Sequence, residues 1–255
     1  MEQKAKNFQD TKKNFNEKGW IKVEKFFLPK EIKNIKNEIN SFLKKNHRKY
    51  SGRSINYTKN KKDWKKINSF HRLHDFKFIS NLSKENKILK LVKELTNAKK
   101  IRLRAAELFA KPLKTGLKSP IHQDNFYWCI KKPKALTLWI ALEKSNKDNG
   151  GVFYYNGSHK LGLLKHVASN SKGSSQTITN NKKLQKLKKT FPKLKSGDCL
   201  IHDSLVVHGS NKNVSNFSRK GFTFQFIDYF SKIDKKRKEK YMKSLKNQIV
   251  KRKLN

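Results

Sequence analysis

Cysteine is almost absent from this sequence. Only Cys129 and Cys199 occur, far apart in the chain, so the sequence offers no disulfide framework and predicts reduced thiols in a cytoplasmic protein. Long apolar runs are also missing, since no stretch approaches the ~18 residues that a membrane-spanning helix needs. Residues 1–7 are polar and contain no apolar segment of the kind found in secretory signals. We therefore expect neither a membrane span nor a signal peptide.

Acidic residues are scarce as well. There are 19 Asp and Glu against 62 Lys and Arg, which gives a formal net charge of +43. A field of this sign attracts polyanions, so contact with nucleic acid or an anionic surface is one interpretation. The other is compositional, because the lysines are spread over almost the whole chain with many Asn and Ile, as an AT-rich coding sequence would produce. Under that interpretation the lysines form ordinary solvated faces.

The apolar content is low but sufficient for one core. The hydrophobic fraction is 35%, and it includes 17 Phe, 7 Tyr and 4 Trp. A chain of 255 residues fits a single large domain, and we expect one domain over 1–255. Its peripheral parts are a polar, loosely ordered arm (1–18), a flexible insertion without a core of its own (165–190) and a basic tail (230–255) that contains an amphipathic helix.

The pattern of the first hundred residues is mainly helical. Apolar residues recur every three or four positions between 30 and 45, which predicts a helix packed against a sheet. Two further helical pieces are expected between 75 and 97, and a short strand at 19–27. The segment 46–72 has little periodicity and is predicted to lie on the surface, with a role as a lid left open.

Strands with Gly and Asn turns dominate the remainder of the chain. We expect strands at 101–109, 135–142, 152–155, 199–208 and 219–228. In the first of these, Ile101, Leu103, Ala105, Glu107 and Phe109 are expected to share one face. Helices followed by many short strands predict an α+β chain whose second part is a sandwich or barrel.

His122 and Asp124 are the first candidates for chemistry. They flank Gln123 on an expected strand, where side chains alternate between faces, so the imidazole and the carboxylate should point the same way. His208 ends another apolar strand just before a Gly-Ser pair, a suitable place for a third ligand at the mouth of a barrel. Two imidazoles and one carboxylate with open positions are the ligand set of non-haem Fe(II) oxygenases. The structural alternative is two packing histidines and a surface acid.

The other six histidines are weaker candidates. Five of them lie in polar or loop segments, namely His47, His71, His74, His159 and His166. The sixth, His202, is adjacent to Asp203, so on a strand the two side chains face opposite sides and cannot chelate one ion together.

Arg219 is the candidate anchor for an anionic cosubstrate. Along 219–228 three phenylalanines share one strand face, so Arg219 belongs to the smaller, more polar face and should point into a cavity. A guanidinium group binds a carboxylate through two parallel hydrogen bonds, which would suit the far end of a keto acid that chelates iron. Ser210 and Trp139 could support the same ligand. The structural alternative is a surface arginine in a very basic protein.

In their order and spacing these motifs resemble the phytanoyl-CoA dioxygenase family of Fe(II)/2-oxoglutarate oxygenases. The matching segments are His122-Gln123-Asp124, Leu138-Trp139-Ile140-Ala141-Leu142, Asn149-Gly150-Gly151, Gly157-Ser158-His159-Lys160, Gly197-Asp198 and His208-Gly209-Ser210, with Arg219 beyond them. The resemblance covers about 100–228, and Gly19-Trp20-Ile21-Lys22-Val23 with the helix after it resembles the opening of the family. Asn156 departs from the family, which usually has proline before Gly-Ser-His.

The resemblance implies a double-stranded β-helix, or cupin-like jelly roll, with helices packed on one side. It implies Fe(II) held by His122, Asp124 and His208, and 2-oxoglutarate held by Arg219 with Ser210, Trp139 and Glu107 nearby. Trp128, Tyr127 and Asn125 become candidate substrate contacts. With O2, such an enzyme hydroxylates a C–H bond of a small molecule and releases succinate and CO2. Because related halogenases have a small residue in place of this carboxylate, Asp124 favours hydroxylation.

Two other functions are alternatives to the enzyme. One is a non-enzymatic protein that uses the same scaffold to bind anions or nucleic acid, which the net charge and the basic tail favour. The other is an iron-binding protein without turnover, against which the complete ligand set and Arg219 argue. No motif selects one substrate or indicates the oligomeric state.

Overall fold

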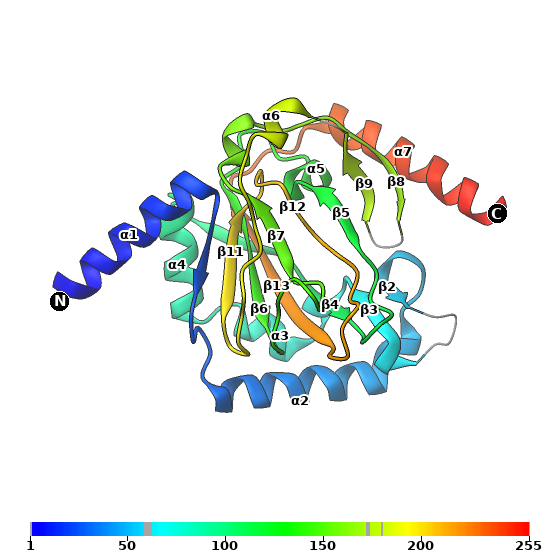
Figure 1. Cartoon of the computed structure of the whole chain (residues 1–255), viewed down its shortest axis with the longest axis horizontal. Coiled ribbons are helices and arrows are strands. Elements are labelled where there is room, and N and C mark those ends of the chain that lie inside the picture. Colours follow the sequence, from blue (N-terminus) through cyan, green and yellow to red (C-terminus); the bar gives the residue numbers. More distant parts are fainter. Residues whose placement is uncertain (1, 59–62, 172–173, 180, 255) are drawn as a thin grey trace.

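Two antiparallel β-sheets face each other at the centre of the molecule (Figure 1). The computed structural model describes residues 2–58, 63–171, 174–179 and 181–254. The larger sheet consists, in spatial order, of β1 (Trp20–Val23), β11 (Cys199–Asp203), β6 (Ala135–Ala141), β13 (Arg219–Asp228), β4 (Ile101–Lys111), β3 (Ile67–Phe70) and β2 (Ile55–Tyr57). The smaller sheet consists of β10 (Lys189–Thr190), β7 (Val152–Tyr155), β12 (His208–Ser210) and β5 (Ser119–His122). A separate hairpin pairs β8 (His166–Ser171) with β9 (Ser174–Ile178).

Helices cover the outer face of the larger sheet. The helices are α2 (Pro29–Asn46), α3 (Lys77–Leu82) and α4 (Asn86–Thr96), and α2 runs along the lower edge in Figure 1. Their buried side chains and those of the outer sheet face form one apolar cluster, in which Ile35 and Ile88 pack with Leu138 and Phe224. Each such side chain contributes about 1.5–3 kcal/mol on burial. The predicted α+β jelly roll with helices on one side is confirmed.

The sequence explains where α2 begins and which face it buries. Pro29 occupies the first turn, where a missing N–H costs no helical hydrogen bond. The Glu31 carboxylate accepts a hydrogen bond from the Leu28 N–H at 2.6 Å, which satisfies a free backbone donor at the helix start. Ile32 and Ile39 belong to the buried stripe that the three- and four-residue spacing predicts.

Four further helices belong to the described residues. They are α1 (Glu2–Lys18), α5 (Asp124–Trp128), α6 (Lys182–Gln185) and α7 (Lys235–Leu254), and short 3-10 turns occupy His47–Lys49, Gly52–Ser54, Trp64–Lys66, Leu73–Asp75 and Ser158–Leu161. α1 and α7 project on opposite sides of the molecule, where the two termini lie (Figure 1). Within the described ranges no helix combines the length and apolar character required to cross a membrane.

Two segments near the N-terminus are more regular than predicted. Residues 2–18 form α1 instead of a loose arm, and Phe15 anchors this helix in the main apolar cluster. The expected surface segment 46–72 contributes β2 and β3 to the edge of the larger sheet. Tertiary pairing with β4 explains the strands that the weak periodicity did not predict.

The expected insertion at 165–190 also differs from the prediction. It contains the β8–β9 hairpin, α6 and β10. Ile178 and Leu184 are buried with Val207 in a small apolar cluster, so the segment has packed side chains, contrary to the prediction that it lacks a core. The basic tail forms α7 as predicted.

A β-bulge in the β4–β13 pair changes the face to which several residues belong. The register shifts between Gln225 and Phe226, and Arg104 is the residue of β4 left without a partner. Leu103 therefore packs on the outer apolar cluster, so the prediction that it shares a face with Glu107 is wrong. The same bulge turns Arg104 inward, where it donates a hydrogen bond to Gln225 at 2.6 Å.

The predicted strand 199–208 is divided between the two sheets. β11 ends at Asp203 in the larger sheet, and β12 begins at His208 in the smaller one. A turn stabilised by the Asp203 carboxylate, which accepts from the Leu205 N–H at 2.7 Å, carries the chain across. As a result the rings of His202 and His208 approach each other from opposite sheets, with centroids 4.5 Å apart.

Candidate metal centre and its surroundings

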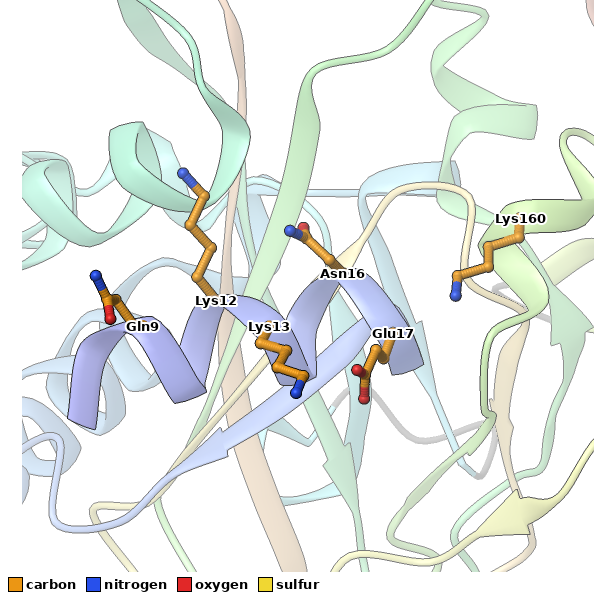
Figure 2. Close-up of a pocket in the computed structure, with 6 residues that line it drawn as sticks. All are labelled: Gln9, Lys12, Lys13, Asn16, Glu17 and Lys160. Atoms are coloured by element: carbon orange, nitrogen blue, oxygen red, sulfur yellow. The ribbon is translucent and has the colours of Figure 1, made fainter. Parts of the chain in front are cut away.

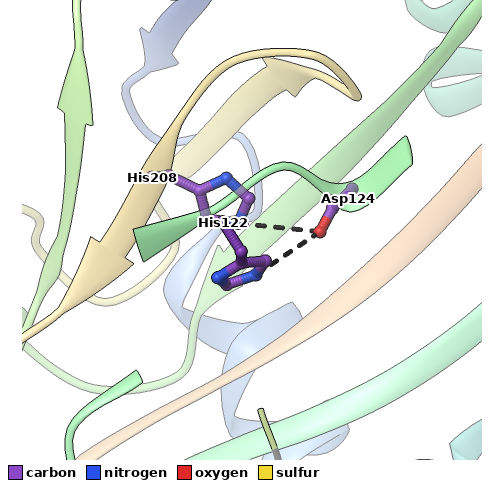
Figure 3. Close-up of side chains that lie close together, drawn as sticks. All are labelled: His122, Asp124 and His208. Atoms are coloured by element: carbon purple, nitrogen blue, oxygen red, sulfur yellow. Dashed lines mark ion pairs between the residues drawn. The ribbon is translucent and has the colours of Figure 1, made fainter. Parts of the chain in front are cut away.

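Two histidines and one aspartate converge between the sheets. The ligand atoms of His122, Asp124 and His208 all lie within 4.8 Å of one another. Oδ1 of Asp124 is 3.8 Å from Nε2 of His122 and 3.6 Å from Nε2 of His208, as the dashed lines in Figure 3 mark. Two imidazole nitrogens and a carboxylate oxygen form a donor set that fits a divalent first-row metal ion.

Backbone carbonyls fix the orientation of both imidazoles. Nδ1 of His122 lies 2.7 Å from the Pro120 carbonyl oxygen, and Nδ1 of His208 lies 3.1 Å from that of Val206. A carbonyl only accepts, so each Nδ1 carries the proton and each Nε2 presents a lone pair to the cluster. Burial lowers the pKa of both imidazoles, which favours the neutral form that binds metals.

Strand pairing and a helix start bring the three side chains together. His122 and His208 are direct cross-strand partners in β5 and β12, so their side chains share one face. Asp124 is the first residue of α5, and the expectation that His122 and Asp124 share a continuous strand is therefore wrong. The chain leaves β5 at Gln123, whose buried side-chain amide donates to the carbonyls of Gly162 and Leu205. Gln123 thus points away from the cluster, as predicted.

His202 also reaches this cluster, which the sequence reasoning missed. Its Nε2 lies 3.2 Å from Oδ2 of Asp124, and its Nδ1 lies 3.0 Å from the Tyr154 hydroxyl oxygen. The Thr137 hydroxyl donates to the same Oδ2 at 2.6 Å. Oδ2 therefore has two polar partners, whereas Oδ1 faces His122 and His208. Strand parity in β11 could have indicated this, because His202 is two residues from Leu200, which packs between the sheets.

The contact with His202 helps to keep Asp124 ionised. Burial alone would raise the pKa of this carboxyl, but the hydrogen bond with the His202 imidazole holds it below its usual range. The carboxylate therefore remains a negatively charged ligand at neutral pH.

Arg219 is buried between the sheets, as its parity on β13 predicts. Its side chain is only 2% exposed, and its Nη2 donates to the Gly150 carbonyl at 2.8 Å. Its guanidinium carbon lies 5.2 Å from the centre of the Trp139 ring. The Nε–H has no hydrogen-bond partner among the described residues. Burial lowers the pKa of Arg219 to about 9, so the group remains cationic at neutral pH.

Trp139 lies flat against β13 because Gly221 leaves room for it. A Cβ atom on Gly221 would come within 2.2 Å of the indole. The residues Trp139 and Ser210 are both buried and belong to the faces that meet between the sheets, Ser210 two positions beyond His208. The positions predicted for cosubstrate support therefore line the same interior as Arg219.

Lys111 is a second buried basic residue beside Arg219 and was not predicted. The two residues are direct cross-strand partners in β4 and β13. Lys111 is 3% exposed, and its ammonium group donates to the Asn211 carbonyl. Burial, reinforced by the neighbouring Arg219, lowers the pKa of Lys111 to about 6.

Glu107 faces inward but is already engaged with other side chains. Its carboxylate accepts from the Gln225 amide at 2.9 Å and lies 3.2 Å from Nδ1 of His71. The predicted role beside Arg219 is therefore replaced by a polar network that also includes Arg104 through Gln225.

One aromatic residue of α5 flanks the metal cluster, and its neighbour Trp128 packs against Arg104. The Tyr127 ring lies 5.6 Å from the ring of His122, and Trp128 packs beneath the Arg104 guanidinium at 5.0 Å. The role of both residues as substrate contacts stays a prediction. The Asn125 amide is buried and bonds the Ile130 N–H and carbonyl, so it shapes the turn after α5.

A separate surface hollow lies beside α1. Its volume is about 510 Å³, and it is lined by Gln9, Lys12, Lys13, Asn16, Glu17 and Lys160 (Figure 2). None of the residues of the metal cluster or of the Arg219 region borders it, and we assign the chemistry to the interior between the sheets.

The chain is similar in sequence to known proteins. The sequence model of the family described as "Phytanoyl-CoA dioxygenase (PhyH)" matches residues 15–221. The protein named phytanoyl-CoA dioxygenase domain-containing protein 1 from Danio rerio is 29% identical over 164 residues, which cover 62% of this chain and 56% of that protein. The chain thus spans little more than half the length of this curated relative.

Solved structures share the fold at lower identity. EctD from S. alaskensis, determined with 2-oxoglutarate and 5-hydroxyectoine, superposes with a TM-score of 0.73 at 17% identity, covering 88% of this chain and 77% of that one. The non-heme alpha-ketoglutarate-dependent carbocyclase SnoK from nogalamycin biosynthesis gives a TM-score of 0.70 at 15% identity, covering 88% and 86%. These structures confirm the predicted fold.

Proposed function

The chain belongs to the phytanoyl-CoA dioxygenase family, and from that premise we propose that it is an Fe(II)- and 2-oxoglutarate-dependent dioxygenase that hydroxylates a C–H bond of a small molecule. One observation carries the proposal: the His122, Asp124 and His208 cluster and the buried Arg219 line the same interior, each on a face turned toward the other sheet. A metal and an anionic chelator require these two features together.

His122, Asp124 and His208 would hold the iron. The two carbonyl-anchored imidazoles present Nε2, and Asp124 supplies one negative charge. Three protein ligands leave positions for a chelating cosubstrate and O2. The bound iron and 2-oxoglutarate supply the oxidative chemistry, with release of succinate and CO2, while the protein supplies binding and orientation.

Arg219 would bind the distal carboxylate of 2-oxoglutarate. Its unpartnered Nε–H is a free donor in a buried site, where an anion gains more from a charged hydrogen bond than it does in water. Trp139 stacks against the guanidinium and restricts its rotation, and Ser210 lies on the interior face beyond His208. A buried arginine without such an anion would be costly, which supports a ligand at this position.

The substrate would enter on the α5 side. Tyr127 borders the cluster there, and Arg104 retains solvent exposure above the adjacent Trp128. Gln225 lies opposite Thr137 on the neighbouring strand, and Thr137 contacts Asp124, so Arg104 is separated from the metal ligand by two side chains. An accessible guanidinium at this place favours a substrate with an acidic group.

Asp124 favours hydroxylation over halogenation. A halide would need the coordination position that this carboxylate occupies, and Thr137 and His202 hold the carboxylate in place. Hydroxylation is therefore the reaction proposed.

The direct test is iron- and O2-dependent formation of succinate from 2-oxoglutarate, measured over a panel of small acidic molecules with matched neutral analogues. We expect at least one acidic compound to stimulate succinate formation and to gain one oxygen atom by mass spectrometry. Fully iron-loaded protein that neither binds 2-oxoglutarate nor forms succinate with any compound would refute the proposal.

A second candidate function is contact with polyanions. Between residues 235 and 250 of α7, where the structure describes side-chain burial, six lysines are exposed, namely Lys235, Lys236, Lys238, Lys240, Lys243 and Lys246. A row of exposed cations on one helix attracts nucleic acid or anionic surfaces in a salt-dependent manner. This activity would accompany the dioxygenase reaction, because α7 covers α5 through Tyr241 and Arg237 without supplying a ligand to the metal cluster.

A further inference from the structure

We propose that Lys111 is a second cationic anchor for the distal carboxylate of the cosubstrate, acting beside Arg219. The inference rests on the proposed function, since it assumes that a dicarboxylate keto acid occupies the interior between the sheets.

The geometry places the two cationic side chains together. Lys111 and Arg219 face each other across β4 and β13, and the side chains of direct antiparallel partners project to the same face. Arg219 donates to the Gly150 carbonyl, and a Cβ atom on Gly150 would lie 3.2 Å from the Lys111 ammonium nitrogen. Gly150 also has a φ of +78°, which favours glycine, so the backbone here leaves room for both cationic groups.

The two basic groups at this position have no protein carboxylate beside them in the part of the chain that the structure describes. Among the described residues no carboxylate forms an ion pair with Lys111 or Arg219, and both side chains are almost fully buried. Glu143, which favours the charged form of Arg219, is itself paired with Lys36 at 3.4 Å. Burying two neighbouring groups in their charged forms is unfavourable unless an anion joins them, so Lys111 without a ligand loses its proton more readily than a free amine. A carboxylate with two oxygens can accept from both groups.

If Lys111 binds the distal carboxylate, its protonation state should change on binding, and this change can be measured. Its pKa of about 6 in the free protein leaves the amine mostly neutral at pH 7.5. Arg219 is the charged group that acts on it, and Asn211 offers only a carbonyl. An arriving carboxylate would favour the ammonium form, so binding should take up a proton from the buffer. Arg219 alone would produce no such uptake, because it is already protonated.

The test is calorimetric titration of Mn(II)-loaded protein without O2, using 2-oxoglutarate and 2-oxopentanoate as ligands. The second ligand keeps the keto acid and chain length but lacks the distal carboxylate. We expect Lys111→Met to weaken 2-oxoglutarate binding by ~10–100-fold, the range of a lost charged hydrogen bond. Binding of 2-oxopentanoate should change by less than about threefold. Lys118→Met, at an exposed lysine in the neighbouring loop, is the matched control and should change neither affinity.

Repeating the titration in buffers of different ionisation enthalpy measures how many protons the protein takes up when the ligand binds. Wild-type protein should take up close to one proton with 2-oxoglutarate at pH 7.5, and Lys111→Met should take up none. Equal weakening of both ligands, or unchanged affinity and proton uptake in a variant that unfolds cooperatively, would overturn the inference. If wild-type protein binds no 2-oxoglutarate at all, the proposed function itself fails, which is a distinguishable result.

Discussion

The Nε2 atom of His202 lies 3.2 Å from Oδ2 of Asp124, on the side of the carboxylate that faces away from His122 and His208. Nδ1 of the same ring is 3.0 Å from the Tyr154 hydroxyl. If the tyrosine donates to Nδ1, then Nε2 carries the proton and donates to Asp124. This arrangement holds one carboxylate oxygen and leaves the other free to bind a metal, as partners of metal ligands commonly do.

Removing this contact should weaken metal binding. His202→Leu deletes the donor to Asp124, so we expect the affinity for Co(II) or Fe(II) to fall by ~10–100-fold. Tyr154→Phe keeps the imidazole and removes only its hydroxyl partner, and its effect should be smaller. Metal titration followed by the Co(II) absorption spectrum measures both variants. Unchanged metal affinity in a folded His202→Leu protein would show that the contact serves packing alone.

Replacing the carboxylate ligand should abolish hydroxylation. Asp124→Ala removes the only anionic ligand of the cluster, so we expect substrate-dependent succinate formation to fall by at least ~100-fold. The hydroxylated product should be lost even where iron still binds through the histidines. Asp148→Ala, at an exposed aspartate, is the control that should retain activity. Product formation by Asp124→Ala at a rate near that of the wild type would contradict the assigned ligand set.

Lys111 should make stability depend on pH. Its pKa is about 6 in the folded protein and near 10.5 when unfolded, so between these values the unfolded chain binds the extra proton. Stability should therefore rise with pH from about 6 upward and be lowest below 6. Lys111→Met should raise the free energy of unfolding of the ligand-free protein by roughly 2–5 kcal/mol at pH 7. Denaturant unfolding at pH 6.5, 7.5 and 8.5 measures this, and a difference independent of pH would argue against it.

Arg104 should determine the preference for acidic substrates. Arg104→Gln removes the charge above Trp128 and retains a polar side chain, so KM for an acidic substrate should rise by ~10–100-fold. The affinity for 2-oxoglutarate should stay within a factor of about two, because the cosubstrate lies at Arg219. Lys93→Gln on α4 is a control for the loss of one positive charge. Equal effects on acidic and neutral substrates would indicate a structural role for Arg104.

The exposed lysines of α7 should account for binding to polyanions. Changing Lys236, Lys240, Lys243 and Lys246 to Gln should reduce DNA affinity and lower the slope of log affinity against log salt by up to ~3–4. Succinate formation should remain as in the wild type. Fluorescence anisotropy at several salt concentrations gives the slope. An unchanged slope would mean that these lysines form only a solvated face.

The local sequence pattern predicted the position of Arg219 correctly and that of Asp124 only in part. The parity of β13 placed Arg219 opposite the phenylalanine face, and the structure buries it there. His122 and Asp124 do converge, but Asp124 arrives on α5 because the chain leaves the strand at Gln123. The hydrogen bonds of Gln123 to Gly162 and Leu205 fix that departure, and such distant partners are not visible in a three-residue motif.

The sequence by itself determined the α+β class, the outward apolar faces and the residue types of the metal cluster, because these depend on periodicity and on short, ordered motifs. Only the tertiary structure brought His202 to Asp124 and Lys111 to Arg219. The two contacts join residues that are 78 and 108 positions apart in the sequence, and no local period relates such distant residues. Both contacts depend on strand register and on a chain crossing between the sheets. The bulge that turns Arg104 inward also depends on the tertiary structure, since one extra residue reverses the face to which a side chain belongs.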